Sequence, residues 1–170
     1  MSAQNQLQAF VAFSAAVTGF TQFDLQGTGQ ADAYRSTVAE AVGDEVLAEL
    51  IEAWARVCDS TEKESTLVQN LRRDIFSDPK LGPVGRNIIK LWYVGMWYAL
   101  PSAWVDAFGA LGKNNTFMVS ASAYTAGMLW PAIGGNPPGA RGPGYGSWAD
   151  PPRIPGGLLS ASEPRRQPER

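Results

Sequence analysis

The chain has 170 residues, of which 45% are hydrophobic and 18% are charged, and its formal net charge is −2. This length and composition predict one compact domain, and the slightly acidic balance gives no electrostatic footprint for nucleic acid. Histidine is absent, which excludes a Ser-His-Asp or Cys-His nucleophile system and a histidine-ligated zinc, haem or copper site within these residues. We therefore expect no catalytic, cofactor-binding or metal-binding residue in this chain.

The single cysteine, Cys58, can form neither an intrachain disulfide nor a CxxC motif. Two interpretations stay open. The thiol is packed in the core, or, in an oxidising compartment, it forms a disulfide with another chain.

The first half of the chain has the periodicity of amphipathic helices. Helices are predicted over residues 5–18, 30–42 and 44–58, and a fourth is predicted over about 61–78, with Leu67, Val68, Leu71 and Ile75 as its buried stripe. Residues 20–29 are predicted to be a linker that closes on a Gly-Thr-Gly turn. This GxG is not a dinucleotide fingerprint, because Asp32 occupies the third glycine position. The pattern predicts an all-α fold, a compact bundle of about five to seven helices over residues 5–130.

Residues 83–104, PVGRNIIKLWYVGMWYALPSAW, are the most distinctive stretch and carry Trp92, Trp97 and Trp104. On one helix, kinked or broken at Pro101, their apolar side chains would surround the axis, and such a helix must be buried on every side. The cover is either the core of the chain itself or a partner protein. Further helices are predicted over residues 104–111 and 116–130, the last of which ends at Trp130.

The composition changes after Trp130. Residues 131–157 contain eight glycines and seven prolines around Tyr145 and Trp148, a composition that cannot build a packed core and is typical of an extended arm. Residues 158–170 are predicted to be a disordered tail. The two aromatic residues would fix the arm on another surface, either that of its own domain or that of a partner.

No segment is predicted to cross a membrane, because the uncharged stretches are too short or too rich in polar residues, glycine and proline. No lysine or arginine precedes Arg35, so residues 7–23 lack the basic region of a signal peptide.

Two stretches resemble a known family. Residues 81–104, LGPVGRNIIKLWYVGMWYALPSAW, and residues 117–152, FMVSASAYTAGMLWPAIGGNPPGARGPGYGSWADPP, are similar to the small (gamma) subunit of bacterial FAD-dependent sugar and polyol dehydrogenases. This is the sorbitol dehydrogenase small-subunit family, which includes subunits of fructose and glucose dehydrogenase complexes. Residues 9–34 are also similar, and the combination LWPA…PPG…PGYGSWA is the specific part of the match.

The resemblance implies a non-catalytic accessory subunit that stabilises, and helps to mature or co-export, a large subunit of the glucose-methanol-choline oxidoreductase type. That partner would carry FAD and the sugar site, and a third subunit, a cytochrome c with haem c, would pass electrons onward. Such complexes are periplasmic and membrane-associated. Family members commonly bring a twin-arginine leader, and this sequence shows none, so a cytoplasmic location stays open.

The candidate partner contacts are Trp92, Trp97, Trp104, Trp130, Tyr145 and Trp148, together with an interchain disulfide at Cys58. The alternative function is a free-standing carbohydrate-binding module. It would need an exposed aromatic platform with amide and carboxylate neighbours.

Overall fold

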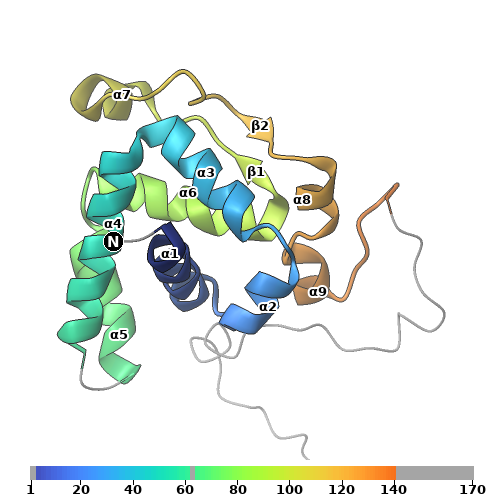
Figure 1. The fold of residues 1–170 in the computed structure, drawn as a ribbon, viewed down its shortest axis with the longest axis horizontal. Coiled ribbons are helices and arrows are strands. Elements are labelled where there is room, and N and C mark those ends of the chain that lie inside the picture. The colour runs from blue at the N-terminus through green and yellow to red at the C-terminus, as the bar shows by residue number, and fades with distance from the viewer. Residues whose placement is uncertain (1–2, 62–63, 141–170) are drawn as a thin grey trace, which may run out of the picture.

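The computed structural model describes residues 3–61 and 64–140. Over these residues the regular structure is helical apart from one two-stranded antiparallel sheet, which confirms the predicted all-α bundle. The central helix is α6, which contacts α1, α3 and α4 (Figure 1). The bounds are α1 Ala3–Thr18, α2 Gln22–Gly27, α3 Ala31–Val42, α4 Asp44–Asp59, α5 Glu64–Leu71, the π-helix η1 Arg72–Phe76, α6 Leu81–Val94, β1 Met96–Trp97, α7 Ser102–Phe108, β2 Phe117–Met118, α8 Ala121–Thr125 and α9 Leu129–Ile133.

The core lies where α1, α3, α4 and α6 meet, because each of these helices turns an apolar stripe inward. Phe10 of α1, Tyr34 of α3 and Trp92 of α6 are almost completely buried there. The Trp92 ring meets Tyr34 edge-on, with 4.9 Å between the ring centroids, and lies 6.4 Å from Phe10. Burial raises the pKa of the Tyr34 phenol well above its usual range. Trp92 therefore joins α6 to both α1 and α3 in the core.

The predicted linker over residues 20–29 contains a helix, α2, that the sequence analysis missed. Thr21 caps it: its hydroxyl accepts a hydrogen bond from the Asp24 backbone N at 3.1 Å, while the Thr21 backbone N donates to Asp24 Oδ2 at 3.2 Å. This reciprocal pair is a capping box with aspartate in the usual place of glutamate. Gly29, at φ +69°, then turns the chain into α3, so the GxG is a turn between two helices.

The aromatic stretch is not one helix, which corrects the prediction for residues 83–104. Helix α6 ends at Gly95, which adopts a left-handed conformation at φ +71°, and the chain continues into β1. Met96 and Trp97 pair with Met118 and Phe117 of β2. The predicted helix over residues 116–130 is therefore also wrong, and β2, α8 and α9 take its place.

Small residues explain how these two segments come together. An ideal Cβ on Gly95 would lie 2.6 Å from the carbonyl of Ala123, and one on Gly127 would lie 2.7 Å from the carbonyl oxygen of Tyr93. Such close approach lets the Met128 backbone N donate to the Trp92 carbonyl at 2.9 Å. The small residues permit a backbone contact with the end of α6.

Asn114 holds the chain that links α7 to β2. Its Oδ1 accepts hydrogen bonds from Trp97 Nε1 at 3.3 Å and from the Leu100 backbone N at 2.9 Å. Replacing it in Asn114→Ala leaves both donors unpaired, and we expect the free energy of unfolding to fall by about 2 kcal/mol. Urea unfolding followed by tryptophan fluorescence measures the loss. Asn115→Ala, at an exposed neighbour, is the control, and an equal loss in the control would contradict the role of Asn114.

The predicted arm starts later than expected, since residues 131–133 belong to α9. Pro131 is tolerated there because a helix leaves the N–H groups of its first turn without intrahelical partners. Residues 134–140 form turns and irregular structure. The rest of the predicted arm, with Tyr145 and Trp148, and the predicted tail lie outside the described residues. In the described ranges, no helix combines the length and the apolar run that a membrane span requires.

Candidate docking surface

Three of the tryptophans predicted to contact a partner belong to the chain's own core. Trp92, Trp97 and Trp104 are 1%, 0% and 4% exposed. The turn at Gly95 folds the aromatic stretch back on the bundle, and Trp104 Nε1 donates to the Lys80 carbonyl at 2.9 Å. Their assignment as partner contacts is therefore corrected: their own chain supplies the cover.

Trp130 is partly buried and has a structural role of its own. Its Nε1 donates to the Tyr124 carbonyl at 2.7 Å, and its ring lies edge-on to the Tyr124 ring at 5.4 Å between centroids. It therefore fastens α9 to α8. Whether its remaining surface meets a partner stays a prediction, as it does for Tyr145 and Trp148.

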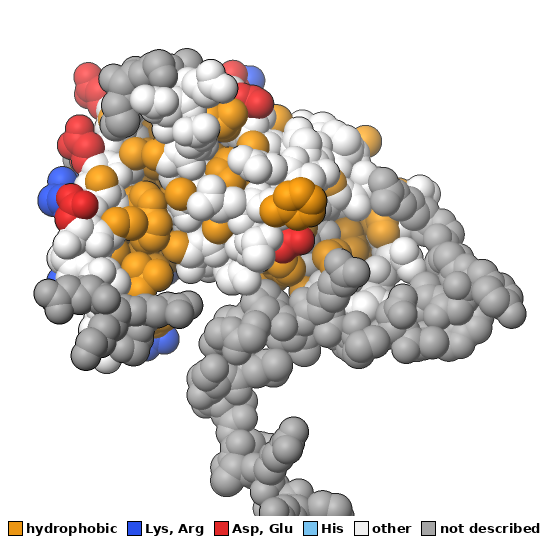
Figure 2. All heavy atoms as spheres, turned by 60° about the horizontal axis from the view of Figure 1, so that its bottom comes forward, with side chains coloured by type: hydrophobic (Ala, Val, Ile, Leu, Met, Phe, Trp, Pro, Cys, Tyr) orange, Lys and Arg blue, Asp and Glu red, His pale blue; other side chains and the backbone are white. Residues whose placement is uncertain are grey.

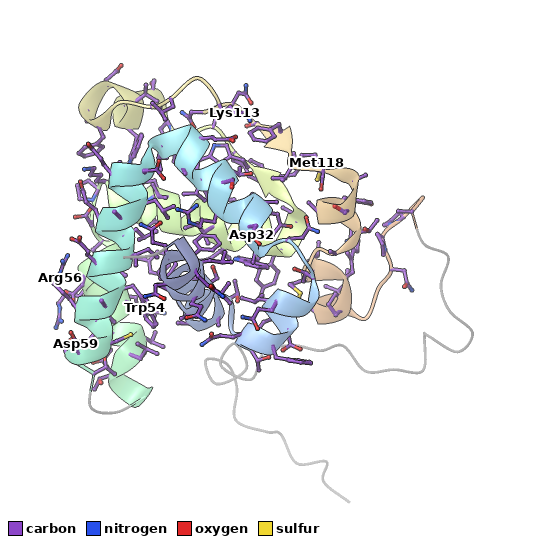
Figure 3. The ribbon with its side chains drawn as sticks, viewed as in Figure 1. Asp32, Trp54, Arg56, Asp59, Lys113 and Met118 are labelled. Carbon is purple, nitrogen blue, oxygen red and sulfur yellow. The ribbon has the colours of Figure 1, made fainter. Side chains whose placement is uncertain are left out.

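Cys58, in the last turn of α4, is exposed, so the interpretation as a packed thiol is wrong. Partial burial and, secondarily, the neighbouring Asp59 carboxylate raise the pKa of the thiol, which disfavours the reactive thiolate. Asp59 and Arg56 lie on the outer side of α4, whereas Trp54 points toward α1 and meets Phe13 edge-on (Figure 3). An interchain disulfide at Cys58 stays a prediction.

An apolar hollow lies between α1, α5, η1 and α6, and we call it the α1–α6 groove. Its volume is about 510 Å³. Val68 on its α5 wall is 54% exposed. Figure 2 turns the lower side of Figure 1 forward and shows hydrophobic side chains gathered on that face. The groove is lined by Ala16, Val17, Thr18, Gly19, Val68, Leu71, Arg72, Phe76, Arg86 and Ile89.

A π-helical turn, η1, follows α5 directly. The Ser77 backbone N donates to the Arg72 carbonyl five residues earlier, at 2.9 Å, so this turn is wider than an α-helical turn. Leu71 and Ile75, on either side of the start of η1, are buried, whereas Val68 lies earlier in α5 and faces out. The predicted stripe of the fourth helix is thus correct for Leu71 and Ile75 and wrong for Val68. Single π-turns within helices frequently mark functional sites.

The side of the groove where α6 meets η1 is fixed by several contacts. Arg86 Nη2 donates to the Phe76 carbonyl at 2.9 Å, and the guanidinium lies over the Phe76 ring at 5.9 Å from its centroid. A Cβ on Gly82 would be 2.6 Å from that same carbonyl oxygen, so only glycine lets α6 approach η1 this closely. The groove is therefore preformed in the isolated chain.

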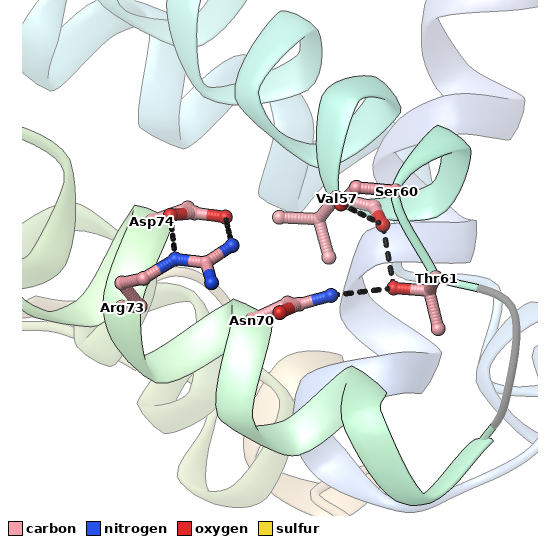
Figure 4. Close-up of polar contacts among 6 residues, drawn as sticks. All are labelled: Val57, Ser60, Thr61, Asn70, Arg73 and Asp74. Atoms are coloured by element: carbon pink, nitrogen blue, oxygen red, sulfur yellow. Dashed lines mark hydrogen bonds and ion pairs between the residues drawn. The ribbon is translucent and has the colours of Figure 1, made fainter.

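The α5 wall is fixed from its other side. The Thr61 hydroxyl donates to the Val57 carbonyl at 2.6 Å and accepts from Asn70 Nδ2 at 3.1 Å (Figure 4). This links the end of α4 to the last turn of α5. On the outer side of η1, Arg73 Nε pairs with Asp74 Oδ1 at 2.6 Å, and this pair lowers the pKa of the Asp74 carboxyl.

A second hollow, of about 330 Å³, has a different character. It is lined by Gln6, Phe10, Arg35, Asp44, Leu47, Ala48, Ile51 and Glu52. Arg35 Nη2 donates to Gln6 Oε1 at 2.8 Å. Amide and carboxylate groups are present, but the Phe10 ring is 0% exposed and offers no platform for a sugar. This hollow does not favour the carbohydrate-binding alternative.

Large apolar side chains are also exposed outside the groove. The most exposed is Phe23 on α2, at 83%. The others lie on separate elements and are Phe108, Leu111, Met118 and Ile133.

Among the described residues no group of three or more His, Cys, Asp or Glu side chains is placed to hold a metal ion. Comparisons of the chain with protein-family models, with curated proteins and with solved structures gave no match. The groove and the resemblance of residues 81–104 and 117–152 are the two features of the chain that bear on its function.

Proposed function

We propose that this chain is a non-catalytic accessory subunit that binds and stabilises a large FAD-dependent sugar or polyol dehydrogenase subunit. The α1–α6 groove carries the proposal. It is apolar, preformed and open, with a valine more than half exposed on its wall. Contiguous exposed apolar surface of this kind marks sites of protein interaction.

The placement of the family-like residues supports the same function. Residues 81–104 and 117–133 form one unit, joined by the β1–β2 pair and by the hydrogen bond from Met128 to Trp92. The Tyr124 hydroxyl donates to the Pro138 carbonyl at 3.2 Å, which fixes the start of the glycine- and proline-rich segment. In the proposed complex this segment lies on the partner and contacts it through Tyr145 and Trp148.

The proposed mechanism is stabilisation by burial. A chain that binds only the folded large subunit shifts that subunit's folding equilibrium by mass action. The partner supplies FAD and the sugar site, and a cytochrome c subunit with haem c accepts the electrons. The complex is membrane-associated and periplasmic, and binding of the folded large subunit couples its maturation to its export.

A charge in the groove should break the complex. In Val68→Asp a carboxylate must leave water when the apolar partner surface covers the groove, and the loss at such a hot spot is about 2 kcal/mol or more. We expect at least about a tenfold smaller yield of flavoprotein when the tagged variant is purified from the native host. Flavin absorbance per tagged chain measures it.

Leu111→Asp provides the matched control, since Leu111 is 52% exposed and lies outside the groove. We expect this variant to recover as much flavoprotein as the wild type. An equal loss in both variants would contradict docking through the groove, and a wild-type chain that recovers no flavoprotein would contradict the proposed function itself.

A further inference from the structure

We infer that the α1–α6 groove binds an amphipathic helix of the large subunit that carries aspartate or glutamate beside its apolar face. The inference rests on the proposed function and specifies the segment of the partner that is recognised. Three observations lead to it: the size of the groove, the kind of groups that line it and the charge of its rim.

The groove has room for several apolar side chains. Its volume of about 510 Å³ is roughly three times that of an engineered ~150 Å³ cavity that holds benzene. Two or three large side chains therefore fit, the number that one face of a helix presents at spacings of three and four residues.

The lining favours a helix over an added strand. The lining residues of α1, α5, η1 and α6 offer side chains, because helical backbone groups are already bonded within their own helices. At the end of α1, the Gly19 backbone N donates to the Ala15 carbonyl at 3.0 Å. Strand addition needs an open row of backbone donors and acceptors, whereas binding of a helix in a groove needs apolar side-chain contacts.

The rim is positively charged. Arg72 and Arg86 both line the groove, and none of the described residues that line it is acidic, although the whole chain has a net charge of −2. Arg86 is held in place by Phe76, as described above, so little further side-chain entropy is lost when it pairs with a ligand. Because a guanidinium matches a carboxylate in a two-point contact, the segment bound here carries Asp or Glu at the edge of its apolar face.

A photo-cross-link tests the inference in the full chain. Val68 is replaced by p-benzoyl-phenylalanine in the tagged chain, which is expressed in the native host, irradiated and purified, and the cross-linked peptide is sequenced. We expect a peptide of the flavoprotein with apolar residues at helical spacing and an acidic residue within one turn of them. The same replacement at Leu111 is the control and should give no flavoprotein peptide.

Charge reversal tests the role of the rim. Arg72→Glu should lower the yield of the Val68 cross-link at least about fivefold, because a rim charge controls association and its salt dependence. Lys113→Glu, an equal change of charge outside the groove, should leave the yield unchanged. Replacing the acidic residue of the identified peptide by lysine should restore cross-linking to the Arg72→Glu variant, an outcome that a merely structural role of Arg72 would not produce.

The outcomes that overturn the inference are distinct from those that overturn the proposed function. If the flavoprotein co-purifies but Val68 cross-links to residues 141–170 of this chain, to a second copy or to nothing, the inference is wrong and the accessory function stands. A flavoprotein peptide without an acidic residue also overturns it. If no flavoprotein co-purifies, the proposed function fails and the inference fails with it.

Discussion

Gly95→Ala should destabilise the fold by about 3–5 kcal/mol, or prevent folding. The added methyl group is unfavourable for two reasons, a strained backbone conformation and a steric clash with α8. The backbone at Gly95 has φ +71°, a conformation that costs an L-residue about 1–2 kcal/mol. The added Cβ would also lie 2.6 Å from the carbonyl carbon and oxygen of Ala123 and 2.9 Å from the Tyr124 backbone N. These are backbone atoms that cannot rotate away, so α8 must move off the end of α6.

The matched control for this prediction is Gly29→Ala. Gly29 has a similar φ of +69°, but a Cβ there would meet no atom within 4 Å. It therefore carries the conformational cost alone, and we expect a loss of about 1–2 kcal/mol. Urea denaturation followed by circular dichroism gives both values. If the two variants lose equal stability, the close contact between Gly95 and Ala123 does not hold these segments together.

Trp92→Ala should cost about 3–5 kcal/mol, the range for removing a large buried aromatic side chain. Trp92 is 1% exposed and contacts the rings of Tyr34 and Phe10, so its removal leaves a cavity where α1, α3 and α6 meet. In a chain of this size the melting temperature should fall by roughly 10 °C. Thermal unfolding followed by near-ultraviolet circular dichroism measures the shift.

Trp92→Phe distinguishes packing from hydrogen bonding at this position. Within the described residues the buried Trp92 Nε1 has no hydrogen-bond partner, so phenylalanine loses only part of the buried area. We expect less than half the loss seen in Trp92→Ala. A loss in Trp92→Phe as large as that in Trp92→Ala would show that the indole nitrogen contributes an interaction absent from this account.

The sequence predicts those parts of the fold that depend on local pattern. The helices α1, α3 and α4 follow from the spacing of apolar residues, and Gly43 and Gly95 end helices by taking positive φ. Helix α2 was predictable too, because Thr21 and Asp24 have capping-box spacing. The β1–β2 pair was not, because it joins residues about twenty positions apart through contacts that no local pattern encodes.

The candidate site was less predictable than the fold. Tryptophan and tyrosine are enriched both in cores and at interfaces, so sequence could not separate Trp92 and Trp97, which are buried, from a contact surface. The groove depends on the exposure of Val68 and on the close packing of Gly82 against Phe76. Both are set by the tertiary packing of α5, η1 and α6. In the sequence, Val68 has the spacing of the buried residues around it, so no local pattern predicts that its side chain is exposed.

The most direct test of the accessory function is the absorption spectrum of the tagged wild-type chain purified from its native host. We expect a stoichiometric flavin, carried by a large subunit that oxidises a sugar or polyol when a dye is added. A colourless chain that purifies alone would contradict it.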